Sequence, residues 1–183
     1  GMTRWTTSDI PQQDGRSIVI TGTGGLGFQA ALALARAGAD VTIAGRNPAK
    51  GVAALEEIRA AVPDAQVQFE EVDLSRLASV TAFAERLRSS RTQLDVLINN
   101  AAVMTPPTRQ STADGFELQF GTNYLGHFAL TAQLLPLLQQ CNAPRVITLS
   151  SVAARQGSMN FDDLQAERSY QPMPVYAQSK LAC

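Results

Sequence analysis

Residues 17–27 read SIVITGTGGLG, and the architecture expected for the whole chain follows outward from them. The first five residues are a short β-branched run, which is typical of a buried strand, and a glycine cluster closes it. The alanine- and leucine-rich segment that follows favours a helix with Gly38 as its C-terminal stop. These residues therefore predict a strand, a glycine turn and a helix in succession.

The same alternation continues along the chain. Further strands are expected at residues 41–44, 67–72, 94–98 and 145–149. Helices are expected from Pro48 to about Val62 with Asn47 as N-cap, after a cap at Ser75, and over residues 115–139 with an interruption at Pro136. Strands that are apolar on both faces and alternate with helices indicate a parallel sheet covered on two sides. We therefore expect an α/β fold, a doubly wound Rossmann-type sheet with strand order 3-2-1-4-5, in a single domain over residues 1–183.

The composition excludes several classes of protein. Hydrophobic residues make up 45% of the 183 residues and charged residues 17%, which is a globular composition. Fifteen Lys and Arg residues against sixteen Asp and Glu residues leave no basic excess for binding nucleic acid. No apolar run approaches the ~18 residues of a membrane span, and the first residues do not resemble a signal peptide. Cys141 and Cys183 form no C-x-x-C cluster, so we expect no metal site and a reducing cytoplasm.

The glycine turn is a candidate phosphate-binding site. Gly22, Gly24 and Gly27 satisfy the G-x-G-x-x-G pattern between a predicted strand and a predicted helix. Glycines let the backbone approach a pyrophosphate, whose charge is stabilised by free N–H groups and the helix dipole. The alternative is a turn that serves packing only. The predicted cofactor contacts at this turn are Gly22, Thr23, Gly24, Gly25, Leu26 and Gly27.

Arg46 indicates which dinucleotide is bound. Sites that prefer NAD(H) carry an acidic residue about 20 positions after the glycines, at the end of the second strand. Residues 44–47 read AGRN and hold no carboxylate, whereas the Arg46 guanidinium can clamp a 2′-phosphate. We therefore expect NADP(H) to be preferred over NAD(H). The alternative is a solvated arginine beside the next helix.

Tyr176 and Lys180 are a candidate acid/base pair. They lie four residues apart, which places them on one face of a helix. A neighbouring ammonium favours phenolate and lowers the pKa of a tyrosine from its ordinary value of about 10 towards working pH. Taken alone, the Y-x-x-x-K spacing is also compatible with a surface pair. His127, the single histidine, has no orienting carboxylate in the pattern, so we interpret it as structural.

Several motifs together resemble the short-chain dehydrogenase/reductase family and occur in that family's order. The long segment between residues 151 and 176 resembles the retinol-dehydrogenase-like branch of the family, and the residues before the first strand resemble bacterial members of that branch. The matching motifs are the glycine turn, Asp73-Leu74, Asn99-Asn100-Ala101-Ala102, Asn123 with Tyr124-Leu125-Gly126, Ser150-Ser151, and Tyr176 to Lys180.

The resemblance implies a role for each matching residue. Tyr176 would exchange a proton with the substrate oxygen, and Lys180 would hold the ribose hydroxyls and tune the phenol. Ser151 would hydrogen-bond the substrate carbonyl, and Asn123 would hold a water that links Lys180 to solvent. The remaining implied cofactor contacts are Asp73 and Leu74 beside the adenine, and Asn99 with Ala101 along the cofactor.

The sequence departs from the family pattern at three places. The glycine turn is one residue shorter than T-G-x-x-x-G-x-G, and Ala102 stands where the family has glycine. The chain ends at Cys183, whereas family members continue through two further strands, so strands 6 and 7 are expected to be absent.

The function expected from these observations is NADP(H)-dependent transfer of a hydride between the nicotinamide and a carbonyl or alcohol substrate. Tyr176 is the expected general acid/base, and the resemblance implies a homodimer or homotetramer. The alternative is a non-catalytic nucleotide-binding module or an inactive fragment of such an enzyme. A methyltransferase is disfavoured, because these enzymes normally place a carboxylate where Arg46 stands.

Overall fold

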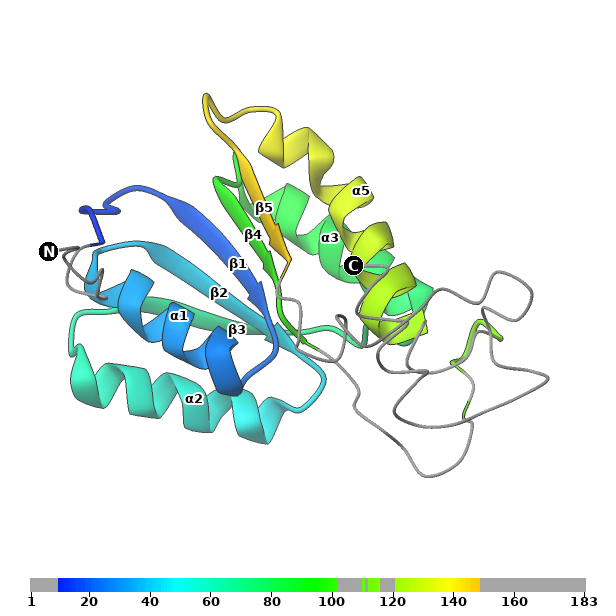
Figure 1. The fold of residues 1–183 in the computed structure, drawn as a ribbon, viewed down its shortest axis with the longest axis horizontal. Coiled ribbons are helices and arrows are strands. Elements are labelled where there is room, and N and C mark those ends of the chain that lie inside the picture. Colours follow the sequence, from blue (N-terminus) through cyan, green and yellow to red (C-terminus); the bar gives the residue numbers. More distant parts are fainter. Residues whose placement is uncertain (1–9, 102–109, 111, 116–120, 149–183) are drawn as a thin grey trace, which may run out of the picture.

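Strands and helices alternate along the chain in the computed structural model (Figure 1). The structure describes residues 10–101, 110, 112–115 and 121–148. The elements are β1 (Ser17–Thr21), α1 (Gly25–Arg36), β2 (Asp40–Gly45), α2 (Pro48–Ala61), β3 (Gln66–Glu71), α3 (Leu77–Ser90), β4 (Val96–Asn99), η2 (Gly121–Gly126), α5 (His127–Leu138) and β5 (Arg145–Thr148). The strands and helices expected from residue 17 to residue 98 are all present, with ends that differ by a residue or two.

The strands form one parallel sheet in the order β3-β2-β1-β4-β5. The predicted α/β class and strand order are therefore confirmed. β1 lies at the centre, paired with β2 on one side and β4 on the other, so the direction in which strands are added reverses at β1. In doubly wound sheets, ligands bind outside the carboxyl ends of the strands at this reversal.

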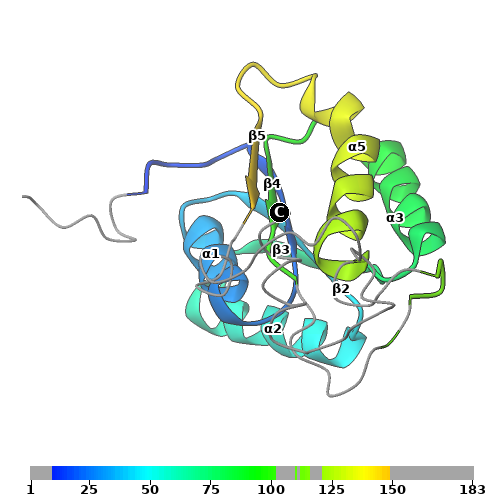
Figure 2. The same cartoon turned by 45° about the vertical axis from the view of Figure 1, so that its right-hand side comes forward.

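Two apolar cores lie on the two faces of the sheet (Figure 2). Successive side chains of a strand point to opposite faces. Ile18 and Ile20 of β1 accordingly pack against α1 and α2, whereas Val19 packs into the second core, which includes residues of α3 and α5. Burial on both faces explains why the central strands are apolar at nearly every position.

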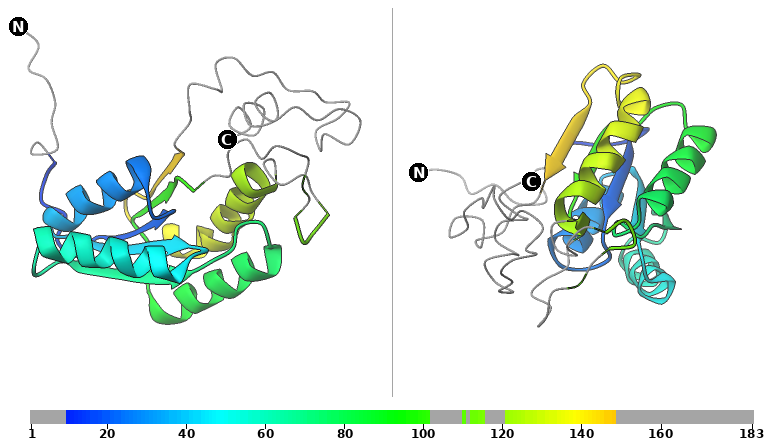
Figure 3. Two further views of the ribbon diagram at one scale, coloured as in Figure 1. Left: turned by 90° about the horizontal axis from the view of Figure 1, so that it is seen from below. Right: turned by 90° about the vertical axis from the view of Figure 1, so that its right-hand side faces the viewer.

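The second layer consists of α3 and α5, which lie side by side (Figure 3). Their contact is made by fully buried side chains, among them Phe83 of α3 and Leu130 of α5. None of the helices in the described part of the chain is long and apolar enough to cross a membrane.

The cap predicted for α3 is wrong. The Ser75 hydroxyl donates to Asp73 Oδ1 at 2.5 Å instead, and Arg76 is the N-cap residue without a side-chain hydrogen bond. The Leu77 N–H donates to Asp114 Oδ2 at 2.7 Å, so a carboxylate 37 positions away takes over the capping. Sequence reasoning considers local caps only and therefore misses this contact.

The helix predicted over residues 115–139 is also wrong in part. Gly115 has a φ of +84° and belongs to a turn, so it cannot begin a helix. Residues 121–126 form a π-helix, and the α-helix begins at His127. Pro136 lies inside the last turn of α5 and does not interrupt it.

Candidate functional site

The glycine turn lies at the carboxyl end of β1, where the strand order reverses. Gly22 has a φ of +93° and Gly25 a φ of +60°, and residues other than glycine rarely adopt positive φ values of this size. Gly24 is the N-cap residue of α1, and neither a side-chain cap nor an acidic residue in the first turn satisfies the free N–H groups there. These N–H groups and the helix dipole make the turn able to hold an anion.

The three motif glycines have different surroundings. A Cβ on Gly27 would overlap the side-chain amide of Asn100, and a Cβ on Gly22 would lie 3.0 Å from the same Asn100 Nδ2. A Cβ on Gly24 would meet no atom of the described residues within 4 Å. Packing therefore requires glycine at position 27, and the positive φ favours it at position 22, whereas Gly24 has open space among the described residues, where a ligand can approach the backbone.

Thr21 joins the turn to the loop after β4. Its buried Oγ1 accepts hydrogen bonds from the N–H of Asn100 at 2.9 Å and from the N–H of Ala101 at 3.0 Å. His127 Nε2 lies 2.8 Å from the same oxygen. Sequence reasoning overlooked Thr21, although a polar residue that ends an apolar strand directly before the glycines is a signal that could have been used.

Arg46 follows β2 and is exposed to solvent. Within the described part of the chain, no ion pair or hydrogen bond engages its guanidinium. The preceding residue is close to the glycine turn, because a Cβ on Gly45 would lie 3.4 Å from the Thr23 methyl group. The Gly22 N–H also donates to the Ala44 carbonyl at 2.7 Å. The arrangement leaves a guanidinium beside the turn that is available to an anionic group.

Asp73 and Leu74 form the start of the loop after β3. Asp73 Oδ1 accepts hydrogen bonds from the Ser75 N–H and hydroxyl, and the Asp73 N–H donates to Ser79 Oγ at 2.9 Å. The Leu74 carbonyl lies so close to Gly126 that any side chain at position 126 would overlap it. The end of the π-helix is therefore packed against the loop after β3.

Asn99 and Ala101 flank the end of β4. The Asn99 side chain is buried, its Nδ2 donates to Thr131 Oγ1 at 3.2 Å, and its Oδ1 has no hydrogen-bond partner in the described part of the chain. The backbone N–H of Ala101 is held by Thr21, as described above. Both residues thus lie at the carboxyl end of the sheet, as the glycine turn does.

The implied catalytic residues fall mainly outside the described part. The backbone of Asn123 belongs to η2, one turn before His127. Ser151, Tyr176 and Lys180 lie outside the described residues. Among the residues that are described, no group of three His, Cys, Asp or Glu side chains could hold a metal ion.

The chain is similar to known dehydrogenases in sequence and in structure. The family model described as short chain dehydrogenase matches residues 16–163. Polyprenol dehydrogenase of Homo sapiens is 43% identical over 176 residues, which are 94% of this chain and 53% of that protein. Retinol dehydrogenase 12 of Mus musculus is 46% identical over 172 residues, which are 93% of this chain and 54% of that protein.

A solved structure from Shigella flexneri, described as a short chain dehydrogenase complexed with NADP, superimposes with a TM-score of 0.73. It is 26% identical, and the match covers 93% of this chain and 68% of that one. The chain spans about half the length of the curated relatives it matches.

Proposed function

Because the chain belongs to the short chain dehydrogenase family, we propose that it is the cofactor-binding part of an oxidoreductase that uses NADP(H). The observation that carries the proposal is the glycine turn, where, among the described residues, Gly24 has open space and the N–H groups of α1 have no side-chain cap. A pyrophosphate fits this chemistry, because backbone N–H groups and the helix dipole both stabilise its charge.

The preference for NADP(H) is supported by Arg46. Its guanidinium is exposed and unpaired within the described residues, and no carboxylate stands at residues 44–47 to hold an unphosphorylated ribose. Planar guanidinium groups form paired, charge-assisted hydrogen bonds with phosphate oxygens. The structural relative complexed with NADP is consistent with this choice.

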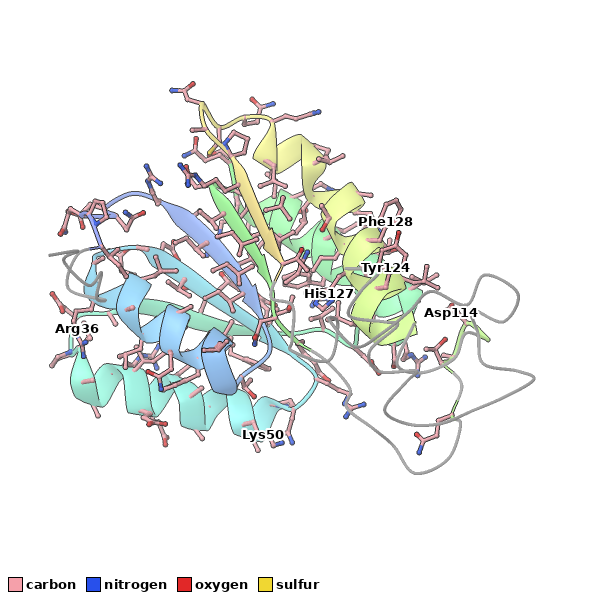
Figure 4. All side chains as sticks on the ribbon, in the orientation of Figure 1. Arg36, Lys50, Asp114, Tyr124, His127 and Phe128 are labelled. Atoms are coloured by element: carbon pink, nitrogen blue, oxygen red, sulfur yellow. The ribbon has the colours of Figure 1, made fainter. Side chains whose placement is uncertain are left out.

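The first experiment is calorimetric titration of the chain and its Arg46→Ala variant with NADPH and with NADH. We expect NADPH to bind at least about tenfold more tightly than NADH, and Arg46→Ala to remove most of that difference. Arg36→Ala is the matched control, since Arg36 is also exposed but lies in the last turn of α1, away from the glycine turn (Figure 4). Equal affinity of the unmodified chain for both cofactors would refute the assignment of Arg46.

For the reaction, we propose acid/base catalysis by Tyr176. Tyr176 exchanges the proton with the substrate oxygen, and a nicotinamide, when bound, would supply or accept the hydride. Lys180 tunes the phenol and holds the ribose, Ser151 donates a hydrogen bond to the carbonyl, and Asn123 positions a water. In the protein with its full C-terminal part, Tyr176→Phe should abolish NADPH-dependent reduction and leave NADPH binding within about threefold. Retained turnover would contradict this role.

The substrate we propose is a small-molecule alcohol or its carbonyl partner. Apolar alcohols are the rational starting set for a screen, because the similar proteins are named for retinol and for polyprenol. We further propose a cytoplasmic location. We also propose a homodimeric or homotetrameric assembly, and sedimentation of the complete protein would test this assembly. A non-catalytic nucleotide-binding module would instead bind NADPH without any turnover.

A further inference from the structure

His127 is the single histidine of the chain, and the proposed chemistry does not use it. It is the first residue of α5, and only 4% of its surface is exposed. In Figure 4 it lies on the inner side of α5, towards the carboxyl ends of the strands. Its Nε2 approaches the hydroxyl of Thr21, which is fully buried and directly precedes the glycine turn.

The hydrogen bonds of Thr21 fix the direction of this contact. A hydroxyl group has one proton to donate and two lone pairs that accept. The N–H groups of Asn100 and Ala101 occupy both lone pairs of Oγ1. The hydroxyl proton therefore points to His127 Nε2, at 2.8 Å.

The direction of the bond determines the protonation of the ring. An Nε2 that accepts a hydrogen bond carries a lone pair, so the proton of the neutral imidazole is on Nδ1. An imidazolium would present its Nε2–H as a third donor to Thr21 Oγ1, whose lone pairs are already used, and would leave the hydroxyl proton without its acceptor. Since Thr21 is fully buried, water cannot replace the lost partner.

Three parts of the candidate site meet at this bond. Thr21 ends β1 before Gly22, and it holds the backbone of Asn100, which in turn packs against the glycine turn. His127 directly follows the π-helix that contains Asn123. The hydroxyl and the imidazole thus connect the glycine turn, the loop after β4 and the segment that leads into α5.

We propose that His127 is a positioning residue of the cofactor site and acts as the neutral Nδ1–H tautomer. By accepting the Thr21 proton, it fixes the hydroxyl so that both lone pairs face Asn100 and Ala101. The glycine turn is thereby held in the shape that binds the cofactor. The effect on NADPH binding rests on the proposed function, whereas the tautomer does not.

The tautomer is tested by nuclear magnetic resonance of the untagged chain labelled with ¹⁵N-histidine. A single histidine gives one pair of ring nitrogens, so no assignment by mutation is needed. We expect a protonated Nδ1 and an unprotonated Nε2 near neutral pH, identified by their couplings to the two ring carbon-bound protons. Thr21→Val should change the Nε2 signal. A protonated Nε2 in the unmodified chain would overturn the proposal.

The positioning role is tested by three variants titrated with NADPH. His127→Leu removes the acceptor and should weaken binding at least about tenfold, whereas His127→Gln offers an amide oxygen to Thr21 and should stay within about threefold of the unmodified chain. Ile58→Val, which removes a methyl group from the core formed with α1 and α2, is the control for general loss of stability and should not change binding.

The outcomes separate the two hypotheses. Unchanged affinity in His127→Leu, or a Gln variant as weak as the Leu variant, would overturn the positioning role. If the unmodified chain does not bind NADPH at all, the proposed function fails, and the resonance experiment still decides whether Thr21 donates to His127.

Discussion

Gly27 of α1 packs directly against the side-chain amide of Asn100 in the loop after β4, with no room for a methyl group between them. The two residues lie in the segments that directly follow β1 and β4, two strands that pair with each other. This contact sets how closely α1 approaches the sheet, which agrees with the role of the last glycine in dinucleotide-binding turns.

Gly27→Ala should therefore destabilise the fold by about 1–3 kcal/mol, because the added methyl group forces Asn100 or α1 to move. Equilibrium unfolding in urea measures this change. In an Asn100→Ala background the methyl group has space, and its cost should fall by at least about 1 kcal/mol. Equal costs in both backgrounds would show that the Gly27–Asn100 contact is not the cause.

Gly24→Ala should weaken NADPH binding and change the stability of the fold very little. Gly24 has a φ of −131°, which alanine adopts readily, and its Cβ would meet no atom of the described chain within 4 Å. The free energy of unfolding should change by at most about 1 kcal/mol, chiefly from the weaker N-cap preference of alanine. NADPH binding should weaken at least about tenfold, because the methyl group occupies the space through which a phosphate approaches. Unaltered affinity would show that the ligand does not lie against Gly24.

Arg91 provides a prediction at the amino ends of the strands, opposite the candidate site. Its guanidinium donates to both carboxylate oxygens of Asp40, at 2.7 and 3.3 Å, and to Ser17 Oγ and Thr42 Oγ1. Arg91→Ala should cost about 1–3 kcal/mol of unfolding free energy, since Asp40 would lose its charged partner in a partly buried position. Ser17 and Asp40 begin their strands, far from the carboxyl ends, so NADPH binding should be unchanged. A parallel loss of binding would contradict the location of the site.

Cys141 should be slow to alkylate. Burial, the hydrogen bond to Asp95 and the negative charge of Asp95 together raise the pKa of the Cys141 thiol from 9.0 to about 11. The rate of modification by iodoacetamide at Cys141, followed by peptide mass spectrometry to separate it from Cys183, should reach half its maximum near pH 11. Asp95→Asn should move that midpoint towards 9.0. A midpoint near 9.0 in the unmodified chain would contradict the contact.

The same shift has a consequence for folding. Because the pKa of the thiol is higher in the folded state, its contribution to stability is complete below pH 9.0 and is lost as the pH rises towards about 11. Unfolding in urea at several pH values across this window should show a smaller decline for Cys141→Ser than for the unmodified chain.

Local patterns predicted most of the elements correctly. The β-branched run before Gly22 is β1, and Asn47 caps α2 through the Lys50 N–H as expected. The errors at Ser75 and Gly115 have one cause. A partner distant in the sequence, Asp114, caps α3, and the turn at Gly115 supplies that partner. A local rule cannot anticipate a contact across 37 positions.

The order of apolar and glycine residues was enough to determine the alternation of strands and helices, and with it the sheet and the end of the sheet where the candidate site lies, because periodicity and turn chemistry act over a few residues. The different surroundings of Gly22, Gly24 and Gly27 depend on the tertiary structure. The hydrogen bond between Thr21 and His127 also depends on it. Thr21 and His127 lie 106 positions apart, and only the packing of α5 against the sheet brings the imidazole to the hydroxyl. Their hydrogen bond therefore forms only in the folded core. Because both groups are buried there, losing the bond would leave a polar group unsatisfied at a cost in free energy.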